Sequence, residues 1–407
     1  MRAADSRWII ANLDCESAWT AEGARQSSRV RCAGEDALKL TALRATSALG
    51  TLLRVFARPG DKLWTPLPVD GARVPPVAGL ATPTLVSGTF AAERPAAVLA
   101  WAETETVAVL REGVSHKRLH SGTRWLDTAW YTTPTDPSLQ RRLSDRQFYT
   151  GLRARLAEPP VGAVWIRTME ELIRHLDSVV DLGVSLRRWV LKAPHSAAGR
   201  ERLFGRGHDL ALAENPSVTT IDRALQVHGR LLFEPWLERL ADFGCAASVG
   251  ETATTTLGVH SQDVDGAGRP CGVSLYTGAV GESVSSFDLT EPELGRLQGS
   301  IEAVGEELRE AGYRGPFGID SWRYRAEDGG VAWMALGEVN VRMTMGLLAR
   351  ALVEQVEPQQ PVRTDRPVRF VFGRQCLPDA AFPGRHYVPL LLAGDEDATE
   401  AYLEYEV

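Results

Sequence analysis

Short apolar runs separated by stretches with helical spacing mark the first third of the chain. The runs at 8–13, 51–56 and 97–101 predict buried strands. Leucines recur at helical spacing over 35–48, which predicts a helix between the first two runs. Strands that alternate with helices are typical of an α/β layer with a partly parallel sheet. The segment 66–83 is rich in Pro and Gly and predicts a surface connection.

The remainder of the chain mixes helices with hairpins. The polar, Pro-containing segment 120–145 is interpreted as a boundary, after which Ser144 is expected to cap a helix. The apolar stripe of that helix is expected to be Phe148, Leu152 and Leu156. Later strands are expected at 164–166, 188–193, 231–234, within 243–276, on both sides of the 327–330 turn and at 368–372, with helices at 168–180, 217–229 and 291–312.

Composition narrows the class of protein. The 407 residues carry 45 basic and 52 acidic side chains, a formal net charge of −7, which does not favour a nucleic-acid partner. No apolar run reaches about 18 residues, so no membrane span is expected, and the first residues do not predict a secretory signal. The five cysteines form no CxxC pair and the histidines are scattered, which favours reduced thiols in the cytoplasm over disulfides or structural zinc. A globular chain of this length is expected to divide into two or three domains.

Lys192 is the first candidate for chemistry, since it ends an apolar strand and precedes a loop of small residues. A lysine in this place can present its charge to a phosphate, while Ser196 and Gly199 allow backbone N–H groups to approach the same anion. Taken alone, the feature is better explained by an ordinary strand and turn with a lysine whose charged end reaches solvent.

A second candidate begins at Glu234, which closes another apolar strand. The following residues Pro235, Trp236 and Leu237 predict an extended hinge whose backbone could bind the edge of a purine between aliphatic neighbours. The alternative is a strand followed by a helix that starts with proline.

The third candidate is a set of polar residues on two hairpin strands. Glu338, Asn340 and Arg342 alternate along one strand and therefore project from one face. Asp320 lies on the strand expected to pair with it. Two carboxylates and an amide oxygen suit one or two Mg²⁺ ions that also bind phosphates. Arg342 could stabilise an anion, and a solvated strand face is the alternative interpretation of the whole set.

These features, in their order along residues 144–346, resemble the ATP-grasp superfamily of carboxylate–amine ligases. The Glu-x-Asn-x-Arg block is the most specific part of this resemblance. The N-terminal stretch is similar to the Rossmann-like domain that precedes this fold. The resemblance implies an α/β (α+β) fold. The implied divisions are a Rossmann-like domain (1–125), a linker with an N-terminal ATP-grasp subdomain (126–230), a C-terminal subdomain with the metal site (231–355) and an extension (356–407).

The resemblance also implies how nucleotide binds. Lys192 would contact the α- and β-phosphates beneath the loop 194–200, Glu234 would accept from the adenine amino group, and Asp242 would contact the ribose. Arg146 stands where the family usually has a lysine, and arginine is not an equivalent cation. The implied ATP-binding residues are Arg146, Lys192, Ser196, Gly199, Glu234, Pro235, Trp236, Leu237 and Asp242.

For metal and catalysis, the resemblance implies Asp320, Glu338 and Asn340 as ligands of Mg²⁺, with Mn²⁺ as the alternative ion. Lys192 and Arg342 are the implied catalytic residues. The candidates for binding a substrate carboxylate are Arg200 and Arg323, although each is also typical of a surface charge.

The implied activity is ATP-dependent activation of a small carboxylate as an acyl phosphate and its ligation to an amine. A kinase or carboxylase on the same fold, a non-catalytic nucleotide-binding module and an unrelated α/β protein stay open as alternatives. The expected partners are ATP and the two small substrates, without nucleic acid or membrane, and a homodimer is the commonest soluble assembly.

Overall fold

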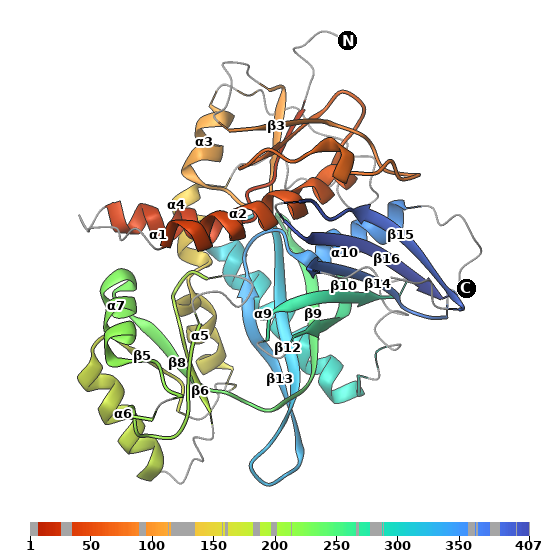
Figure 1. Ribbon diagram of the computed structural model, residues 1–407. Coiled ribbons are helices and arrows are strands. Elements are labelled where there is room, and N and C mark those ends of the chain that lie inside the picture. Colours follow the sequence, from red (N-terminus) through yellow and green to blue (C-terminus); the bar gives the residue numbers. More distant parts are fainter. Residues whose placement is uncertain are drawn as a thin grey trace.

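Three β-sheets organise the part of the chain that the structure describes (Figure 1). The structure is a computed structural model that describes residues 7–25, 35–88, 95–112, 114, 135–156, 158, 162–181, 188–196, 202–212, 214–265, 268–276, 287, 289–356, 363, 365–374, 383–395 and 397–406. Within these ranges, no helix combines the length and the apolar character that crossing a membrane requires.

The N-terminal sheet is parallel throughout, with the strand order β3-β2-β1-β4. Its strands are β1 (Arg7–Ile10), β2 (Lys62–Thr65), β3 (Thr84–Ser87) and β4 (Ala97–Ala100). The helices of this region are α1 (Cys15–Arg25), α2 (Glu35–Gly50) and α3 (Glu105–Arg111). The prediction of alternating strands and helices with a parallel sheet is therefore confirmed.

One strand prediction in this region is wrong. Residues Thr51–Phe56 form a 3₁₀ helix, η2, that continues directly from α2. All six residues are buried, because the segment lies between the N-terminal sheet, the helix α10 (Met345–Gln355) and the C-terminal strands. A short run that is apolar on every side has no periodicity, so sequence alone does not separate a buried strand from a buried helical turn.

The second sheet is small and antiparallel, with the order β5-β8-β6-β7. Its strands are β5 (Val164–Ile166), β6 (Trp189–Lys192), β7 (Arg202–Gly205) and β8 (Leu231–Pro235). Helices α6 (Met169–Asp181) and α7 (Val218–His228) cover one face, where their leucines pack on Trp189 and Phe233 (Figure 1). The other face remains available for a site.

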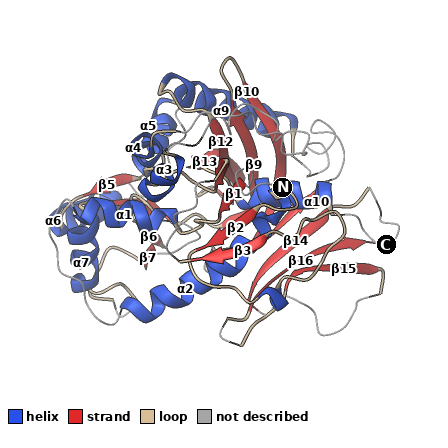
Figure 2. Ribbon diagram, turned by 90° about the horizontal axis from the view of Figure 1, so that it is seen from above, coloured by secondary structure: helices blue, strands red, loops and turns tan. Residues whose placement is uncertain are grey.

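The third sheet has eight strands in the order β13-β12-β9-β10-β11-β14-β16-β15. These are β9 (Arg239–Val249), β10 (Thr254–Val264), β11 (Pro270–Leu275), β12 (Gly315–Arg325), β13 (Val331–Asn340), β14 (Val368–Arg374), β15 (Arg385–Leu391) and β16 (Thr399–Glu406). Helix α9 (Glu291–Glu310) packs on β9, β10 and β13, and α10 (Met345–Gln355) contributes to a separate core with β11 and β14. Seen from above, the small sheet and β14–β16 lie on opposite sides of the molecule (Figure 2).

Helices α4 (Pro137–Leu143) and α5 (Arg146–Arg155) connect the N-terminal region to the small sheet. Asp145, rather than Ser144, caps α5, since its Oδ1 accepts from the Gln147 N–H at 2.8 Å. The expected apolar stripe is also partly wrong, because Leu156 is 39% exposed. The buried face of α5 instead carries Arg146, Tyr149, Leu152 and Arg153.

Candidate active site

The candidate site lies between the open face of the small sheet and one face of the large sheet. On the small sheet, Lys192 pairs in register with Leu232, so Lys192 and Glu234 project from the same face. Lys192 Nζ lies 2.5 Å from Glu234 Oε2, and Arg153 Nη1 donates to Glu234 Oε1 at 2.7 Å. Burial opposes ionisation of Glu234, but these two cations outweigh it and lower its pKa to about 2.

On the large sheet, Asp320 lies directly opposite Glu338 on the neighbouring strand, and Asn340 projects from the same face. The Asn340 amide donates to Asp320 Oδ2 at 3.2 Å, and Gln262 Nε2 donates to Asp320 Oδ1 at 2.9 Å. Burial, followed by the neighbouring Glu338 carboxylate, raises the pKa of Asp320 to about 6. The three residues that the sequence predicts as metal ligands are therefore brought together.

Arg146 connects the two sheets. Its Nη2 donates to Glu338 Oε1 at 2.9 Å on the large sheet and to the Ser196 carbonyl at 3.0 Å beyond β6. Burial would raise the pKa of Glu338, but Arg146, Lys192 and Arg202 together lower it. Cations on and beside the small sheet thus lower the pKa of Glu338, a candidate metal ligand on the large sheet.

The hinge after β8 differs from the prediction for Glu234. Both oxygens of the Glu234 carboxylate are engaged in buried ion pairs, so the side chain is not placed to accept from an adenine amino group. The Trp236 N–H donates to the Arg188 carbonyl at 2.8 Å, and its ring packs edge-on against Phe204. Among the described hydrogen bonds, the Leu237 and Glu238 N–H groups have no partner, so the hinge backbone can still donate to a base.

Asp242 lies on the same face of the large sheet as Asp320 and close to the hinge. Its Oδ1 accepts from Arg239 Nη1 at 2.5 Å, and the Arg239 guanidinium stacks 3.8 Å from the centre of the Trp322 ring. The predicted contact between Asp242 and a ribose therefore requires Arg239 to share this carboxylate.

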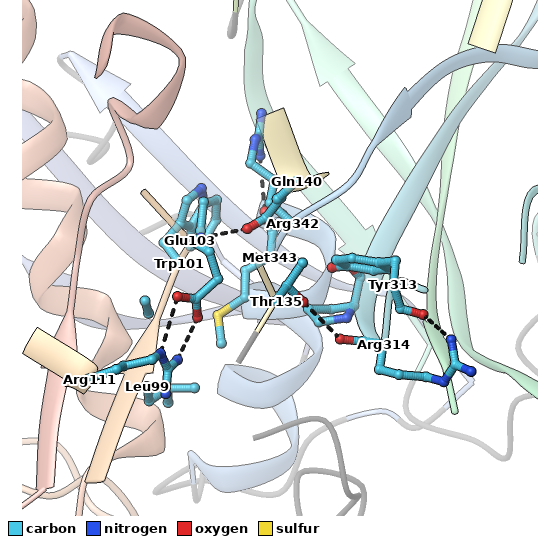
Figure 3. Close-up of a pocket in the computed structure, with 13 residues that line it drawn as sticks. Leu99, Trp101, Glu103, Arg111, Thr135, Gln140, Tyr313, Arg314, Arg342 and Met343 are labelled. Atoms are coloured by element: carbon cyan, nitrogen blue, oxygen red, sulfur yellow. Dashed lines mark hydrogen bonds and ion pairs between the residues drawn. The ribbon is translucent and has the colours of Figure 1, made fainter. Parts of the chain in front are cut away.

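Arg342 is at the junction of the large sheet and the N-terminal region. Its Nε donates to Glu16 Oε1 on α1 at 2.7 Å, and its Nη2 donates to Asn340 Oδ1 at 3.2 Å. Figure 3 shows Arg342 on the wall of a cavity of about 40 Å³ that Trp101 and Glu103 also line. Arg342 therefore couples the metal-site candidate to the N-terminal domain.

The two predicted substrate arginines are not part of this arrangement. Arg323 projects from the opposite face of β12, where it donates to both oxygens of Glu293 at 2.7 Å beside α9. The alternation of side chains along the strand places it away from Asp320, so its prediction as a substrate residue is wrong. Arg200 and Gly199 lie outside the described residues.

Several residues of the site were missed by the sequence analysis. Arg146, Tyr149 and Arg153 follow one another on α5 at spacings of three and four, a helical pattern that indicates one shared face. Arg202 pairs in register with Lys192 and is the matching residue of the next strand. No local pattern indicates Glu16 or Gln262, because each reaches the site from a distant segment.

The donor set fits Mg²⁺. Among the described residues, no group of three His, Cys, Asp or Glu side chains could hold a metal. The set consists instead of Asp320, Glu338 and the Asn340 amide oxygen. Mg²⁺ in nucleotide sites uses one or two carboxylates and completes its coordination with phosphates and water. Among the described residues, Asp320 accepts hydrogen bonds from two amides and is bonded to no cation. A buried carboxylate without a cationic partner is expected of a metal ligand.

The similarity of this chain to known proteins is a similarity of fold. No family model and no curated protein matches the sequence. The chain is similar to N5-carboxyaminoimidazole synthetase from Staphylococcus aureus solved with ADP, at a TM-score of 0.52 and 7% identity, covering 99% of this chain and 93% of that one. It is also similar to N5-carboxyaminoimidazole ribonucleotide synthetase from Thermus thermophilus, at 0.51 and 15% identity, covering 89% and 92%.

A third similar structure is the biotin carboxylase domain of the Hydrogenobacter thermophilus 2-oxoglutarate carboxylase, solved with MgADP and bicarbonate. Its TM-score is 0.50 at 13% identity, over 99% of this chain and 86% of that chain. At these identities the likeness concerns the arrangement of the backbone. The chain has the ATP-grasp fold that its sequence resembles.

Proposed function

We propose that this protein binds Mg·ATP between its small and large sheets and uses it to activate a carboxylate for ligation to an amine. The observation that carries the proposal is the division of charge across the site. Buried cations on one side, Lys192 and Arg146, face two carboxylates and an amide on the other. A polyphosphate with a divalent cation complements this arrangement.

The balance of charge supports a nucleotide phosphate as ligand. Glu234 and Glu338 are the carboxylates that bind the cations of this region. Among the described residues, four cations of this region (Arg146, Arg153, Lys192 and Arg202) stand against three carboxylates, since Asp320 also belongs to it. Buried cations without enough carboxylates favour an anionic ligand, because desolvated charge is costly unless it is paired.

The proposed reaction has two steps. A carboxylate oxygen of the substrate attacks the γ-phosphorus, the bond to the β,γ-bridging oxygen breaks, and ADP leaves. The amine nitrogen then attacks the acyl carbon, phosphate leaves and the surplus proton passes to solvent. Mg²⁺ held by Asp320, Glu338 and Asn340 would neutralise phosphate charge. Lys192 and Arg146 orient the phosphates, and Arg342 offers its guanidinium where the site meets the N-terminal domain.

The similar structures support the nucleotide part of this proposal, since two of them were solved with ADP, in one case with Mg²⁺ and bicarbonate. The cavity of about 40 Å³ beside Arg342 has room for water molecules but not for a small carboxylate.

The test is ADP release with Mg·ATP across a panel of small carboxylates and amines, with separate measurement of Mg·ATP affinity. We expect multiple-turnover release to require both a carboxylate and an amine, because the acyl phosphate must react with the amine before the next cycle. Glu338→Gln is expected to lower the rate by about 10²- to 10³-fold, since it removes charge at the metal site. Glu327→Gln, an exposed residue at the turn of the same hairpin, is the matched control and is expected to be unchanged.

Each other outcome has a clear meaning. Transfer of the γ-phosphate to a stable phosphorylated product would replace the ligase proposal with a kinase. Saturable Mg·ATP binding without ADP release under any substrate pair would favour a binding module. Equal rates for Glu338→Gln and Glu327→Gln would contradict the assignment of the metal site.

A further inference from the structure

Gln262 lies on β10, two strands away from β12 in the large sheet. It pairs in register with Asp242 on β9, so its side chain projects from the face of the sheet that carries Asp320. Its Nε2 donates to Asp320 Oδ1 at 2.9 Å. Neither the sequence pattern nor the similar structures give this glutamine a role.

Gly244 makes this long contact possible. It lies on β9, directly opposite Asp320 on one side and His260 on the other. Neighbouring strands are about 4.8 Å apart, so a side chain of β10 must extend across β9 to meet a group on β12. A Cβ at position 244 would lie 2.6 Å from Gln262 Nε2 and would also collide with the His260 ring. Glycine, which has no side chain, leaves room for the glutamine to cross.

The partners of Asp320 orient it without neutralising it. Gln262 donates to Oδ1, and the Asn340 amide donates to Oδ2 at 3.2 Å, so that among the described residues each oxygen has one amide donor. A carboxylate has about four acceptor sites, and these two bonds leave the other sites for a cation. Amides fix the direction of a carboxylate but add no positive charge, whereas an arginine or lysine would compete with a metal ion.

The other residues of the metal-site candidate have different partners. Glu338 is paired with Arg146, and Asn340 Oδ1 accepts from Arg342 Nη2 at 3.2 Å. Asn340 is itself a candidate ligand, so its bond to Asp320 joins two members of the same set. Gln262 differs because it contacts the set from a strand that contributes no candidate ligand. Its contact with the carboxylate therefore serves orientation.

We propose that Gln262 is a positioning residue of the metal site, which holds the Asp320 carboxylate in one orientation for Mg²⁺ that binds with the nucleotide. This proposal rests on the proposed function and adds to it a residue that reaches the site through the gap at Gly244. Hydrogen bonds to a metal ligand are worth about 10- to 100-fold in metal affinity. The effect of Gln262 is thus expected in the binding of the metal rather than of the nucleotide alone.

The experiment measures the affinity of the full-length protein for ATP by calorimetry, once with saturating Mg²⁺ and once with EDTA. The ratio of the two affinities reports the contribution of the metal. Gln262→Leu is expected to lower this ratio by about 10-fold or more, while the affinity in EDTA changes less than about threefold. Gln298→Leu is the matched control, since it removes an exposed amide that donates to Glu302 on α9, and its ratio is expected to equal that of the wild type.

Three further variants separate positioning from a general structural role. Gly244→Ala keeps the glutamine but displaces its amide, and it is expected to lower the same ratio. In an Asp320→Asn background, Gln262→Leu is expected to cause no further loss, because its effect passes through that carboxylate. Should thermal unfolding show that Gln262→Leu does not fold, Gln262→Asn takes its place. This variant keeps an amide that is one methylene too short, and the same loss is expected.

An unchanged ratio in the Gln262 variant, or equal losses with Mg²⁺ and with EDTA, would overturn the positioning role while the nucleotide site stands. A further loss in the Asp320→Asn background would also overturn it, since Gln262 would then act by another route. A wild-type protein that does not bind ATP, or whose affinity does not depend on Mg²⁺, would instead overturn the proposed function itself.

Discussion

Two carboxylates of the candidate site, Glu234 on the small sheet and Asp320 on the large sheet, have opposite surroundings. Glu234 lies between Lys192 and Arg153, and its pKa is lowered to about 2. Asp320 accepts hydrogen bonds from two neutral amides, lies beside another carboxylate, and has its pKa raised to about 6. Glu234 is thus paired with two cations, whereas Asp320 bonds to none among the described residues. The difference indicates that Glu234 stabilises the fold, and it supports the proposal that Asp320 binds a cation.

The largest expected effect comes from removing the charge of Asp320. Asp320→Asn is expected to lower ADP release by about 10²- to 10³-fold, because the charge that would hold Mg²⁺ is lost. The same change is expected to raise the free energy of unfolding without Mg²⁺ by about 1–3 kcal/mol at pH 8. The folded state binds the Asp320 proton more tightly than the unfolded chain, so the group stabilises the fold below about pH 4, and this contribution is lost as pH rises through about 6.

Denaturant unfolding with and without Mg²⁺ checks the second part of this prediction, with Asp177→Asn, an exposed change on α6, as control. A loss of stability in Asp320→Asn at pH 8 would contradict the view that this carboxylate lacks a cation.

An intermediate effect is expected at Glu234, with the opposite sign for stability. Glu234→Gln is expected to lower the free energy of unfolding at pH 7 by about 3 kcal/mol, because the two buried cations lose their partner. The stabilisation is present above the ordinary pKa of 4.5 and is lost as pH falls toward 2. The difference between wild type and variant should therefore be constant above about pH 5 and shrink in more acidic solution.

Chemical denaturation at several pH values measures this difference, and the exposed Glu214→Gln provides the baseline. A difference that grows on acidification would show that Glu234 is not held by Lys192 and Arg153.

The smallest effect is expected on the far face of the large sheet. Arg323→Gln is expected to leave ADP release unchanged and to cost about 1 kcal/mol of stability, since the Arg323 pair with Glu293 is only partly buried. Kinetics of this variant beside Asp320→Asn test whether the two faces of β12 are separate. A strong loss of activity in Arg323→Gln would indicate that Arg323 belongs to the candidate site.

The sequence predicts those parts of the site that depend on periodicity within one strand or hairpin. Glu338 and Asn340 are two apart, and the turn that follows Arg325 sets the pairing that brings Asp320 opposite Glu338. The fold was predictable because strands and helices with clear periodicity alternate along the sequence. The 3₁₀ helix at Thr51–Phe56 was not, because burial on all sides removes periodicity.

Contacts between distant segments explain the other differences. Glu16 meets Arg342 across 326 residues, and Arg153 meets Glu234 across 81. Charge partners of this kind depend on how the domains pack, and local spacing contains no information about them. For Glu234 the consequence was a prediction of base recognition where the structure has an ion pair.

The continuity of the large sheet into β14, β16 and β15 has a practical consequence for protein production. A chain shortened after α10 would leave β11 without its β14 neighbour, so that a row of backbone amides and carbonyls would face solvent. It would also uncover Val273, Leu275 and α10, which pack with Phe370 and Leu403 in one core. An exposed edge beside an exposed apolar surface promotes intermolecular strand pairing. A chain that ends after α10 is therefore expected to precipitate, and solubility trials should retain residues 356–407.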